Sequence, residues 1–248
     1  MSASFQLYSA RNFTPWDDVF ATLSDLGYTG VEGYGALYDD TAKVRAAMDA
    51  TGLSMPTAHV GIADAENDLD GVVATAKALG IKTIFGPHVA AEDRPSDRAG
   101  WEAFAARLSA IQAALAPHGI SYGWHNHDFE FVACDDGAIP MEVILDSAPE
   151  LQWEADIAWI VRGGGDPIAW ITKYADRISA IHVKDIAPAG ENADEDGWAD
   201  VGEGTMDWSG ILNAVRSKTS ASHFVMEHDN PSDMKRFATR SINNFKAL

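Results

Sequence analysis

The sequence predicts a single (β/α)8 barrel that spans residues 1–248. Short, apolar, β-prone runs alternate with longer helical patterns eight times along the chain, an order that favours a closed parallel sheet. The length is close to the usual size of one such barrel, about 250 residues, and no shift in composition marks a domain boundary. An open, doubly wound sheet is the structural alternative. A dinucleotide-binding version of it is disfavoured, because no G-x-G-x-x-G motif follows the first strand.

The individual elements follow from hydrophobic patterning and from helix-start signals. Strands are expected at residues 5–10, 30–34, 54–60, 83–89, 120–127, 151–157, 178–185 and 224–228. Helices are expected at residues 14–27, 40–50, 69–79, 97–115, 139–147 and 166–175, and again from residues 207 and 230 onward. The first helix shows a clear start signal: Thr14 as a cap, Pro15 at the first helical position and Asp17 in the first turn. Residues 187–206 are expected to form one long acidic loop.

Charge and cysteine content limit the classes of partner and compartment. The formal net charge is −19, which disfavours binding to the phosphates of nucleic acids and to anionic membrane surfaces. Cys134 is the only cysteine, so the chain cannot form an internal disulfide, which fits a reducing compartment. No signal peptide and no apolar run of the ~18 residues needed for a membrane span are visible. A cytoplasmic location is therefore expected.

Polar residues stand where the expected strands stop. In a barrel of this class the active site lies at the C-terminal ends of the strands. Residues two apart on a strand share a face, so pairs such as His125 with His127 can both point into the barrel mouth. The candidate site residues, in chain order, are Glu32, His59, Trp124, His125, His127, Glu130, Glu154, Asp156, Trp159, His182, Lys184 and Glu227.

A divalent metal ion is the simplest group that would neutralise this cluster. Taken one at a time, a strand-end histidine is more often a hydrogen-bonding residue than a ligand, and Glu32 could cap a helix. Taken together, the carboxylates and imidazoles would be costly to bury without a partner. Mixed carboxylate and imidazole ligands suit Mn, Mg, Co or Zn better than calcium. One divalent ion is therefore the predicted cofactor.

These motifs resemble those of the sugar phosphate isomerase/epimerase superfamily, the xylose isomerase-like TIM barrels, over nearly the whole chain. The residues that carry the resemblance are Val31-Glu32, the His-Asn-His-x-Phe-Glu-Phe run at residues 125–131, Glu154-Ala-Asp156, His182-Val-Lys-Asp185, Gly202-Glu-Gly204 and Met226-Glu227. The resemblance implies one divalent ion held at the ends of strands five to eight, with Asp156, His182 and Glu227 in three of the positions. Strand five departs, because His125 stands where the epimerases have a glutamate. His125 is the expected fourth ligand, with His127 and Glu130 as alternatives.

The resemblance also implies an activity. The expected enzyme is an isomerase or epimerase of a sugar, keto-sugar or sugar phosphate, which removes a proton next to a carbonyl through an enediolate intermediate. The catalytic candidates are Glu227 as the first base, Glu154 as a weaker one, His127 as a second acid/base and Lys184 as a cationic partner for the oxyanion; Glu32, His59, Trp124 and Trp159 are the candidate substrate contacts.

Two other functions stay open at this stage. The histidine on strand five suits β-elimination equally well, so a lyase (a dehydratase or a 3-keto-glycoside eliminase) is the alternative. A sugar-binding module without turnover is less favoured, because binding alone requires no metal surrounded by acid/base groups. Endonuclease IV relatives in the same superfamily have a basic DNA-binding face, which a chain of charge −19 does not predict. The expected partners are a small-molecule carbohydrate and a second copy of the chain, as a homodimer.

Overall fold

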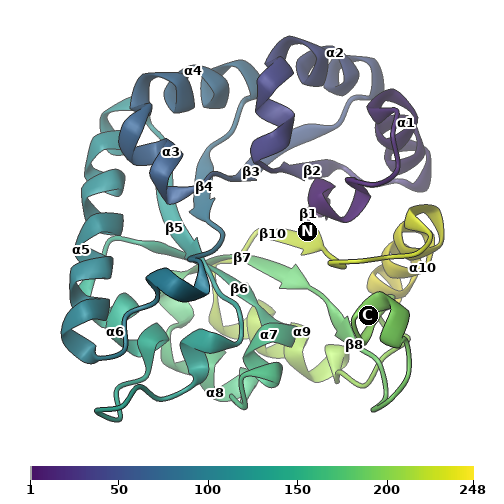
Figure 1. Ribbon diagram of the computed structural model, residues 1–248. Helices are drawn as coiled ribbons and strands as arrows, with labels where there is room; N and C mark the ends of the chain where they lie inside the picture. Colours follow the sequence, from purple (N-terminus) through teal and green to yellow (C-terminus); the bar gives the residue numbers. More distant parts are fainter. Residues whose placement is uncertain (1) are drawn as a thin grey trace.

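Eight parallel strands close into a barrel in the computed structural model, which describes residues 2–248 (Figure 1). The strands are hydrogen-bonded around the barrel in the order β1-β10-β7-β6-β5-β4-β3-β2, and β2 pairs with β1 to close it. Their bounds are β1 Ser2–Gln6, β2 Gly30–Gly33, β3 Ser54–His59, β4 Thr83–Gly86, β5 Ser121–His125, β6 Gln152–Asp156, β7 Ile178–Val183 and β10 His223–Met226. The predicted (β/α)8 barrel is thus confirmed.

Helices surround the barrel on the outside of the sheet (Figure 1). They are α1 Trp16–Leu26, α2 Thr41–Thr51, α3 Ile62–Asn67, α4 Leu69–Leu79, α5 Arg98–Leu115, α6 Pro140–Ser147, α7 Ile157–Arg162, α8 Pro167–Lys173, α9 Trp208–Lys218 and α10 Met234–Ala247. Many begin at an aspartate whose side chain accepts a hydrogen bond from a backbone N–H in the first turn, as Asp40 does for α2 and Asp233 for α10. No helix within residues 2–248 is long and apolar enough to cross a membrane.

Side chains on the strands alternate between the barrel interior and the surrounding helices. Trp124 on β5 faces outward and packs edge-on against Phe104 of α5, with ring centroids 5.1 Å apart. Trp153 on β6 likewise faces outward and lies 6.3 Å from Trp170 of α8. The main apolar core therefore lies between the sheet and its helices, which leaves inward-facing positions near the barrel mouth for polar residues.

Several predicted bounds are wrong at the C-terminal ends of strands. The strand expected at residues 5–10 ends at Gln6, and Leu7–Ala10 forms a 3-10 turn because the Gln6 side chain accepts a hydrogen bond from the backbone N–H of Tyr8. The strand expected at residues 151–157 ends at Asp156, whose side chain caps the short helix α7. Apolar residues continue past each strand end, so hydrophobicity alone does not mark where the backbone turns.

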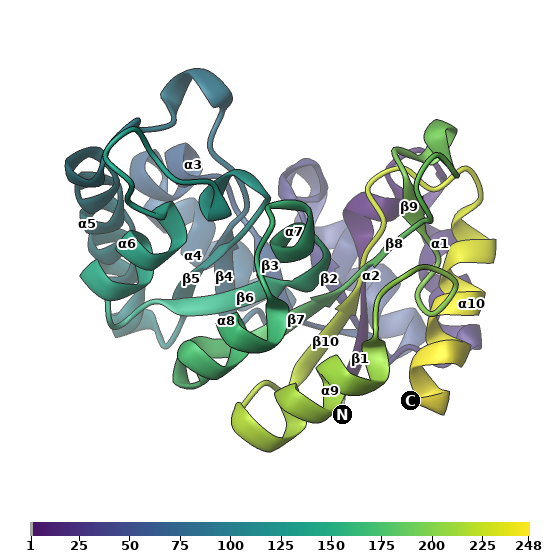
Figure 2. The same cartoon turned by 90° about the horizontal axis from the view of Figure 1, so that it is seen from below.

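Residues 187–206 are more ordered than the predicted loop. They contribute to a two-stranded antiparallel hairpin, β8 Asp185–Ile186 with β9 Trp198–Ala199, which lies near α10 in Figure 2. Arg236 of α10 anchors the segment through salt bridges to Glu195, at 2.8 Å, and to Asp200, at 3.1 Å. Both carboxylates are buried. Part of the acidic character of this segment therefore serves to hold it against α10.

Replacing Glu195 with glutamine should destabilise the protein at neutral pH by about 1.5–3 kcal/mol, the usual contribution of hydrogen bonds to charged groups. Burial opposes ionisation of Glu195, but hydrogen bonds from Arg236 and Ser232 outweigh it and lower its pKa to about 2. A lowered folded-state pKa stabilises the fold above the ordinary pKa of 4.5, and this contribution is lost as the pH falls toward 2. Urea unfolding at several pH values measures it. The exposed Glu191→Gln is the control, and equal stability of the Glu195 variant at pH 7 would contradict the role.

Candidate active site

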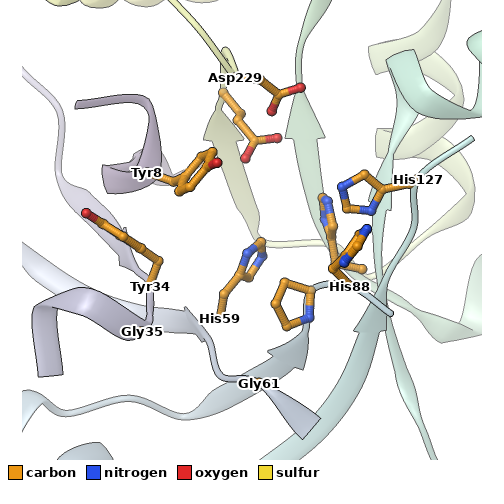
Figure 3. A pocket seen from close by; sticks show the side chains of 11 residues that line it. Tyr8, Tyr34, Gly35, His59, Gly61, His88, His127 and Asp229 are labelled. Carbon is orange, nitrogen blue, oxygen red and sulfur yellow. The ribbon is translucent and has the colours of Figure 1, made fainter. Parts of the chain in front are cut away.

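A cavity of about 490 Å³ opens at the C-terminal ends of the strands (Figure 3). The rings of Tyr8 and Tyr34 lie on one side of it, and His88 and His127 lie on the other. The full lining is Tyr8, Tyr34, Gly35, His59, Gly61, Pro87, His88, His125, His127, Glu227 and Asp229. The cavity therefore lies where the active site of a barrel of this class is found.

Four potential metal ligands meet at one side of this cavity. His125 ends β5, Asp156 ends β6, His182 lies on β7, and Glu227 directly follows β10. One ligand atom from each lies within 4.8 Å of the others, and all four residues are buried. The structure thus brings together the four residues for which the sequence predicted a metal site.

Local structure holds Asp156 with one carboxylate oxygen free. Its Oδ1 accepts a hydrogen bond of 2.9 Å from the backbone N–H of Trp159 at the start of α7, whereas its Oδ2 is buried without a hydrogen-bond partner. Asn126 fixes the strand end, because its Nδ2 donates to the carbonyl of Asp156 and its Oδ1 accepts from the backbone N–H of Asp156. The middle residue of the His-Asn-His run is therefore a clamp between β5 and β6.

Glu227 is held as a carboxylate by two basic neighbours. Its Oε2 lies 2.9 Å from Nδ1 of His182 and accepts a hydrogen bond of 3.3 Å from Nζ of Lys184. Burial opposes ionisation, but the charges of Lys184 and His182 outweigh it and keep the pKa of Glu227 well below its ordinary value. Because Glu227 also lines the cavity, it presents a negative charge to any molecule bound there.

This donor set fits a divalent ion. Oδ2 of Asp156 is a buried oxygen without a hydrogen bond, and Nζ of Lys184 lies 3.8 Å from it, beyond hydrogen-bond distance, so the oxygen can still bind a metal ion. Two carboxylates and two imidazoles form a mixed oxygen and nitrogen set of the kind that binds first-row divalent metals. His125 and Glu227 belong to both the set and the cavity wall, so an ion in this set would be accessible to a substrate.

A second group of possible ligands lies beside the first: His59, His125, Glu154 and His182. It shares two imidazoles with the first set, and its members already contact one another closely. Nε2 of His59 lies 2.6 Å from Oε2 of Glu154, and Nε2 of His182 lies 3.2 Å from the same oxygen. Glu154 is fully buried and is not among the cavity-lining residues, so this second group is the less accessible of the two.

Two imidazoles of the cavity wall, those of His125 and His127, are neutral. Burial, with the neighbouring His182 charge, lowers the pKa of His125 to about 3. Burial also lowers the pKa of His127 well below its ordinary value. His127 lines the cavity next to His125, with ring centroids 5.1 Å apart, but it does not belong to either ligand group. A neutral imidazole beside the ligand set can accept or relay a proton.

The structure corrects several predicted substrate contacts. Trp124 is fully buried on the helix side of β5, where its Nε1 donates to Glu130, so it cannot line the cavity. Glu130 also accepts a hydrogen bond from the backbone N–H of His127, and it therefore supports the strand-five segment instead of replacing His125. Glu32, a predicted substrate contact, and Glu154, the predicted weaker base, are fully buried and are not among the cavity-lining residues.

Lys184 and Trp159 lie next to the cavity wall, where the half-buried ring of Trp159 packs 5.2 Å from that of His127. Nζ of Lys184 is enclosed by the rings of Trp159 and Trp198, at 4.9 and 4.2 Å from their centroids, and forms a salt bridge of 2.6 Å with Asp229. Neither Lys184 nor Trp159 is among the cavity-lining residues, unlike the predicted contacts His59 and His127. Lys184 thus acts through Glu227 and Asp229, because its positive charge lies next to both carboxylates.

Four cavity residues with polar side chains are absent from the sequence-based candidates: Tyr8, Tyr34, His88 and Asp229. His88 and Asp229 follow β4 and β10 within a few residues, so the strand-end rule could have identified them. Tyr8 and Tyr34 follow β1 and β2 but carry no charge, and a search restricted to charged residues passes over them.

Solved structures of several other proteins have the same fold as this chain. A sugar phosphate isomerase/epimerase from Parabacteroides distasonis superposes with a TM-score of 0.83 at 17% identity, over 99% of this chain and 93% of that one. The probable 3-DHS dehydratase AsbF from Bacillus anthracis superposes with a TM-score of 0.79 at 16% identity, over 99% of each chain. The IolI protein, solved with a bound zinc atom, gives 0.77 at 15% identity, over 100% of this chain and 96% of that one. At such identities the likeness shows the fold alone.

Sequence comparison gives the family. The rhizopine catabolism protein MocC from Rhizobium meliloti is 22% identical over 191 residues, which are 70% of this chain. The match spans only 58% of the length of that relative. The family model described as the xylose isomerase-like TIM barrel matches residues 20–247. The barrel, its strand-end site and this match agree, and the chain belongs to the family of xylose isomerase-like TIM barrels.

Proposed function

We propose that this chain is a divalent-metal-dependent isomerase or epimerase that transfers a proton next to the carbonyl of a sugar. The observation that carries the proposal is the meeting of His125, Asp156, His182 and Glu227 at the wall of an open cavity, with an unpartnered carboxylate oxygen on Asp156. Two of these ligands face the space where a substrate would bind. Such an arrangement serves catalysis better than a purely structural ion, whose site is usually closed.

The side chains of the wall supply the acid/base groups. A divalent ion in this set would polarise a substrate carbonyl and so acidify the neighbouring C–H. Glu227, kept ionised by Lys184 and His182, can accept that proton. His127, neutral and not a member of the ligand set, can take that proton from the Glu227 carboxyl and, as the imidazolium, return it to the neighbouring carbon or oxygen. Tyr8 and Tyr34 on the other side of the cavity offer hydroxyls and ring faces to a polyol (Figure 3).

The cavity favours an uncharged sugar over a sugar phosphate. Among residues 2–248, the cavity lining includes no lysine or arginine, and its acidic members are Glu227 and Asp229. Phosphate recognition relies on Arg or Lys side chains or on clustered backbone N–H groups. The proposed partner is therefore a small, unphosphorylated carbohydrate with a carbonyl group.

A lyase is the second candidate, and one observation favours it. In place of a second carboxylate on strand five, the wall presents two neutral imidazoles, His125 and His127. A carboxylate that has removed the proton next to the carbonyl can pass it to an imidazole, and the resulting imidazolium can protonate the departing oxygen. The probable dehydratase AsbF, which shares the fold, indicates that this scaffold is compatible with loss of water.

Incubation of carbonyl sugars in deuterated water distinguishes the two reactions. For an isomerase or epimerase we expect deuterium at the carbon next to the carbonyl and recovery of an isomeric sugar, detected by NMR. A lyase instead releases a substituent and forms an unsaturated product. Removal of divalent ions with a chelator should abolish either reaction, and addition of Mn²⁺, Co²⁺ or Zn²⁺ should restore it. Turnover that persists in the chelated protein, or no exchange and no elimination with any carbonyl sugar, would contradict the proposal.

A further inference from the structure

We propose that Glu32 and Glu154, two buried carboxylates beneath the cavity, fix which nitrogen of His182 faces the metal ion and thereby set the affinity for that ion. Both are positioning residues: neither contacts the substrate or the ion. The inference rests on the proposed function, because it assumes a divalent ion bound by His125, Asp156, His182 and Glu227.

The two nitrogens of His182 point to different groups. Nδ1 lies 2.9 Å from Oε2 of Glu227 and 3.9 Å from Oδ2 of Asp156, so it faces the other ligands. Nε2 lies 2.7 Å from Oε1 of Glu32 and 3.2 Å from Oε2 of Glu154, so it faces the barrel interior. An imidazole binds a metal through one nitrogen and donates the other N–H to an orienting group. The geometry therefore assigns Nδ1 to the ion and Nε2–H to the two carboxylates.

The two carboxylates are themselves held from the far side of the barrel. Nε2 of Gln6, on β1, donates a hydrogen bond of 2.7 Å to Oε1 of Glu32 on β2. Nε2 of His59, at the end of β3, lies 2.6 Å from Oε2 of Glu154 on β6. The ring of His59 stacks on that of His182, with centroids 5.3 Å apart and 13° between the planes. Four strands thus contribute to the orientation of one ligand.

The charge of this layer also favours a cation above it. Oε2 of Glu32 and Oε1 of Glu154 are buried without hydrogen-bond partners. A carboxylate that accepts the N–H of a ligand imidazole makes that imidazole a stronger donor to the metal. Removing either carboxylate should therefore weaken metal binding even though neither residue is in the ligand set centred on Asp156.

The test is metal affinity in Glu32→Gln and Glu154→Gln, measured by competition with a chromogenic chelator for Co²⁺ and Zn²⁺. We expect each variant to bind the ion about 10–100-fold more weakly than the wild type, the usual effect of losing such a partner. The visible spectrum of bound Co²⁺ should change as well, because it reports the orientation of the ligands. Glu142→Gln is the matched control, since Glu142 is on the surface, where it pairs with Lys173.

Thermal unfolding of the metal-free proteins separates positioning from a general structural role. Burial and the nearby charge of Glu154 raise the pKa of Glu32, so Glu32→Gln should not lower the unfolding temperature of the metal-free form. Burial opposes ionisation of Glu154 as well, but the charges of His182 and His59 outweigh it and lower the pKa of Glu154, so Glu154→Gln should lower that temperature. Weaker binding by Glu32→Gln with unchanged metal-free stability supports the inference. Unchanged affinity in both variants, or a loss of affinity that only follows a loss of stability, would overturn it. If one variant fails to fold, the other still decides the question.

Two further outcomes keep this inference distinct from the proposed function. A wild-type chain that binds no divalent ion would reject the proposed function itself. Complete loss of the ion in Glu154→Gln, together with wild-type binding in Asp156→Asn, would place the ion in the group formed by His59, His125, Glu154 and His182. In that case Glu154 would be a ligand, and its assignment as a positioning residue would be wrong.

Discussion

Replacing Asp156 with asparagine should leave a folded barrel that no longer binds a stoichiometric divalent ion. Asparagine keeps an oxygen that can accept the hydrogen bond from the N–H of Trp159, so the start of α7 is preserved. It puts an NH₂ group where the unpartnered Oδ2 now lies, and an amide nitrogen is no ligand for a divalent cation. Burial, chiefly, raises the pKa of Asp156 to about 7, so the metal-free fold loses little when this carboxylate becomes neutral.

The measurement is elemental analysis of the purified protein, combined with thermal unfolding with and without added metal. The wild type should hold about one ion per chain, and an excess of about 100 times the dissociation constant should stabilise it by about 2.7 kcal/mol. The variant should hold none and should not respond to added metal. Its turnover should fall to the level of the chelated wild type.

Asp166→Asn is the matched control for this substitution. Asp166 caps α8 by accepting hydrogen bonds from backbone N–H groups, as Asp156 caps α7, but it is exposed and does not belong to the ligand set. The control should retain metal and turnover. Wild-type metal content in Asp156→Asn would show that the ion is elsewhere or absent, and the proposed function would lose the observation on which it rests.

The ligand set could be predicted from sequence because it depends on simple features of a parallel barrel. Apolar runs locate the strands, their C-terminal ends meet at one mouth, and residues two apart share a face. Asp156 and His182 follow these rules directly, and in the structure they are register partners on β6 and β7. The sequence leaves the strand-five residue ambiguous, and the fold places His125 in the group of potential ligands and bonds Glu130 to Trp124.

The depth of each side chain could not be predicted in this way. Strand alternation indicates which face a residue occupies but not its height along the barrel axis, which depends on strand tilt and register. The register shifts between Gly30 and Glu32 on β2, and again between Trp153 and Glu154 on β6. Such irregularities depend on long-range pairing and leave no local signal. The sequence therefore predicts Glu32 as a substrate contact and Glu154 as a base, whereas in the structure both are fully buried and neither lines the cavity.

Replacing His127 with glutamine should lower turnover by about 10²–10⁴-fold, the usual contribution of a general acid or base. His127 lines the cavity, and its Nδ1 has no hydrogen-bond partner. Its backbone is fixed independently of the ring, because Glu130 accepts a hydrogen bond of 2.9 Å from its N–H. Glutamine should therefore keep the local structure while losing the ability to exchange a proton. Since His127 is outside both groups of potential ligands, metal content should not change.

This variant also separates the isomerase from the lyase. If His127 returns a proton to carbon, Glu227 still removes the substrate proton in the variant, and isomer formation falls while deuterium exchange at the original carbon persists. If His127 protonates a departing oxygen, exchange persists and the unsaturated product disappears. Steady-state kinetics and NMR in deuterated water measure both, with the exposed His118→Gln as the control. Turnover at the wild-type rate would contradict an acid/base role for His127, and so would loss of the metal ion. Deuterium exchange without product formation is the result expected when the residue that transfers the second proton is missing.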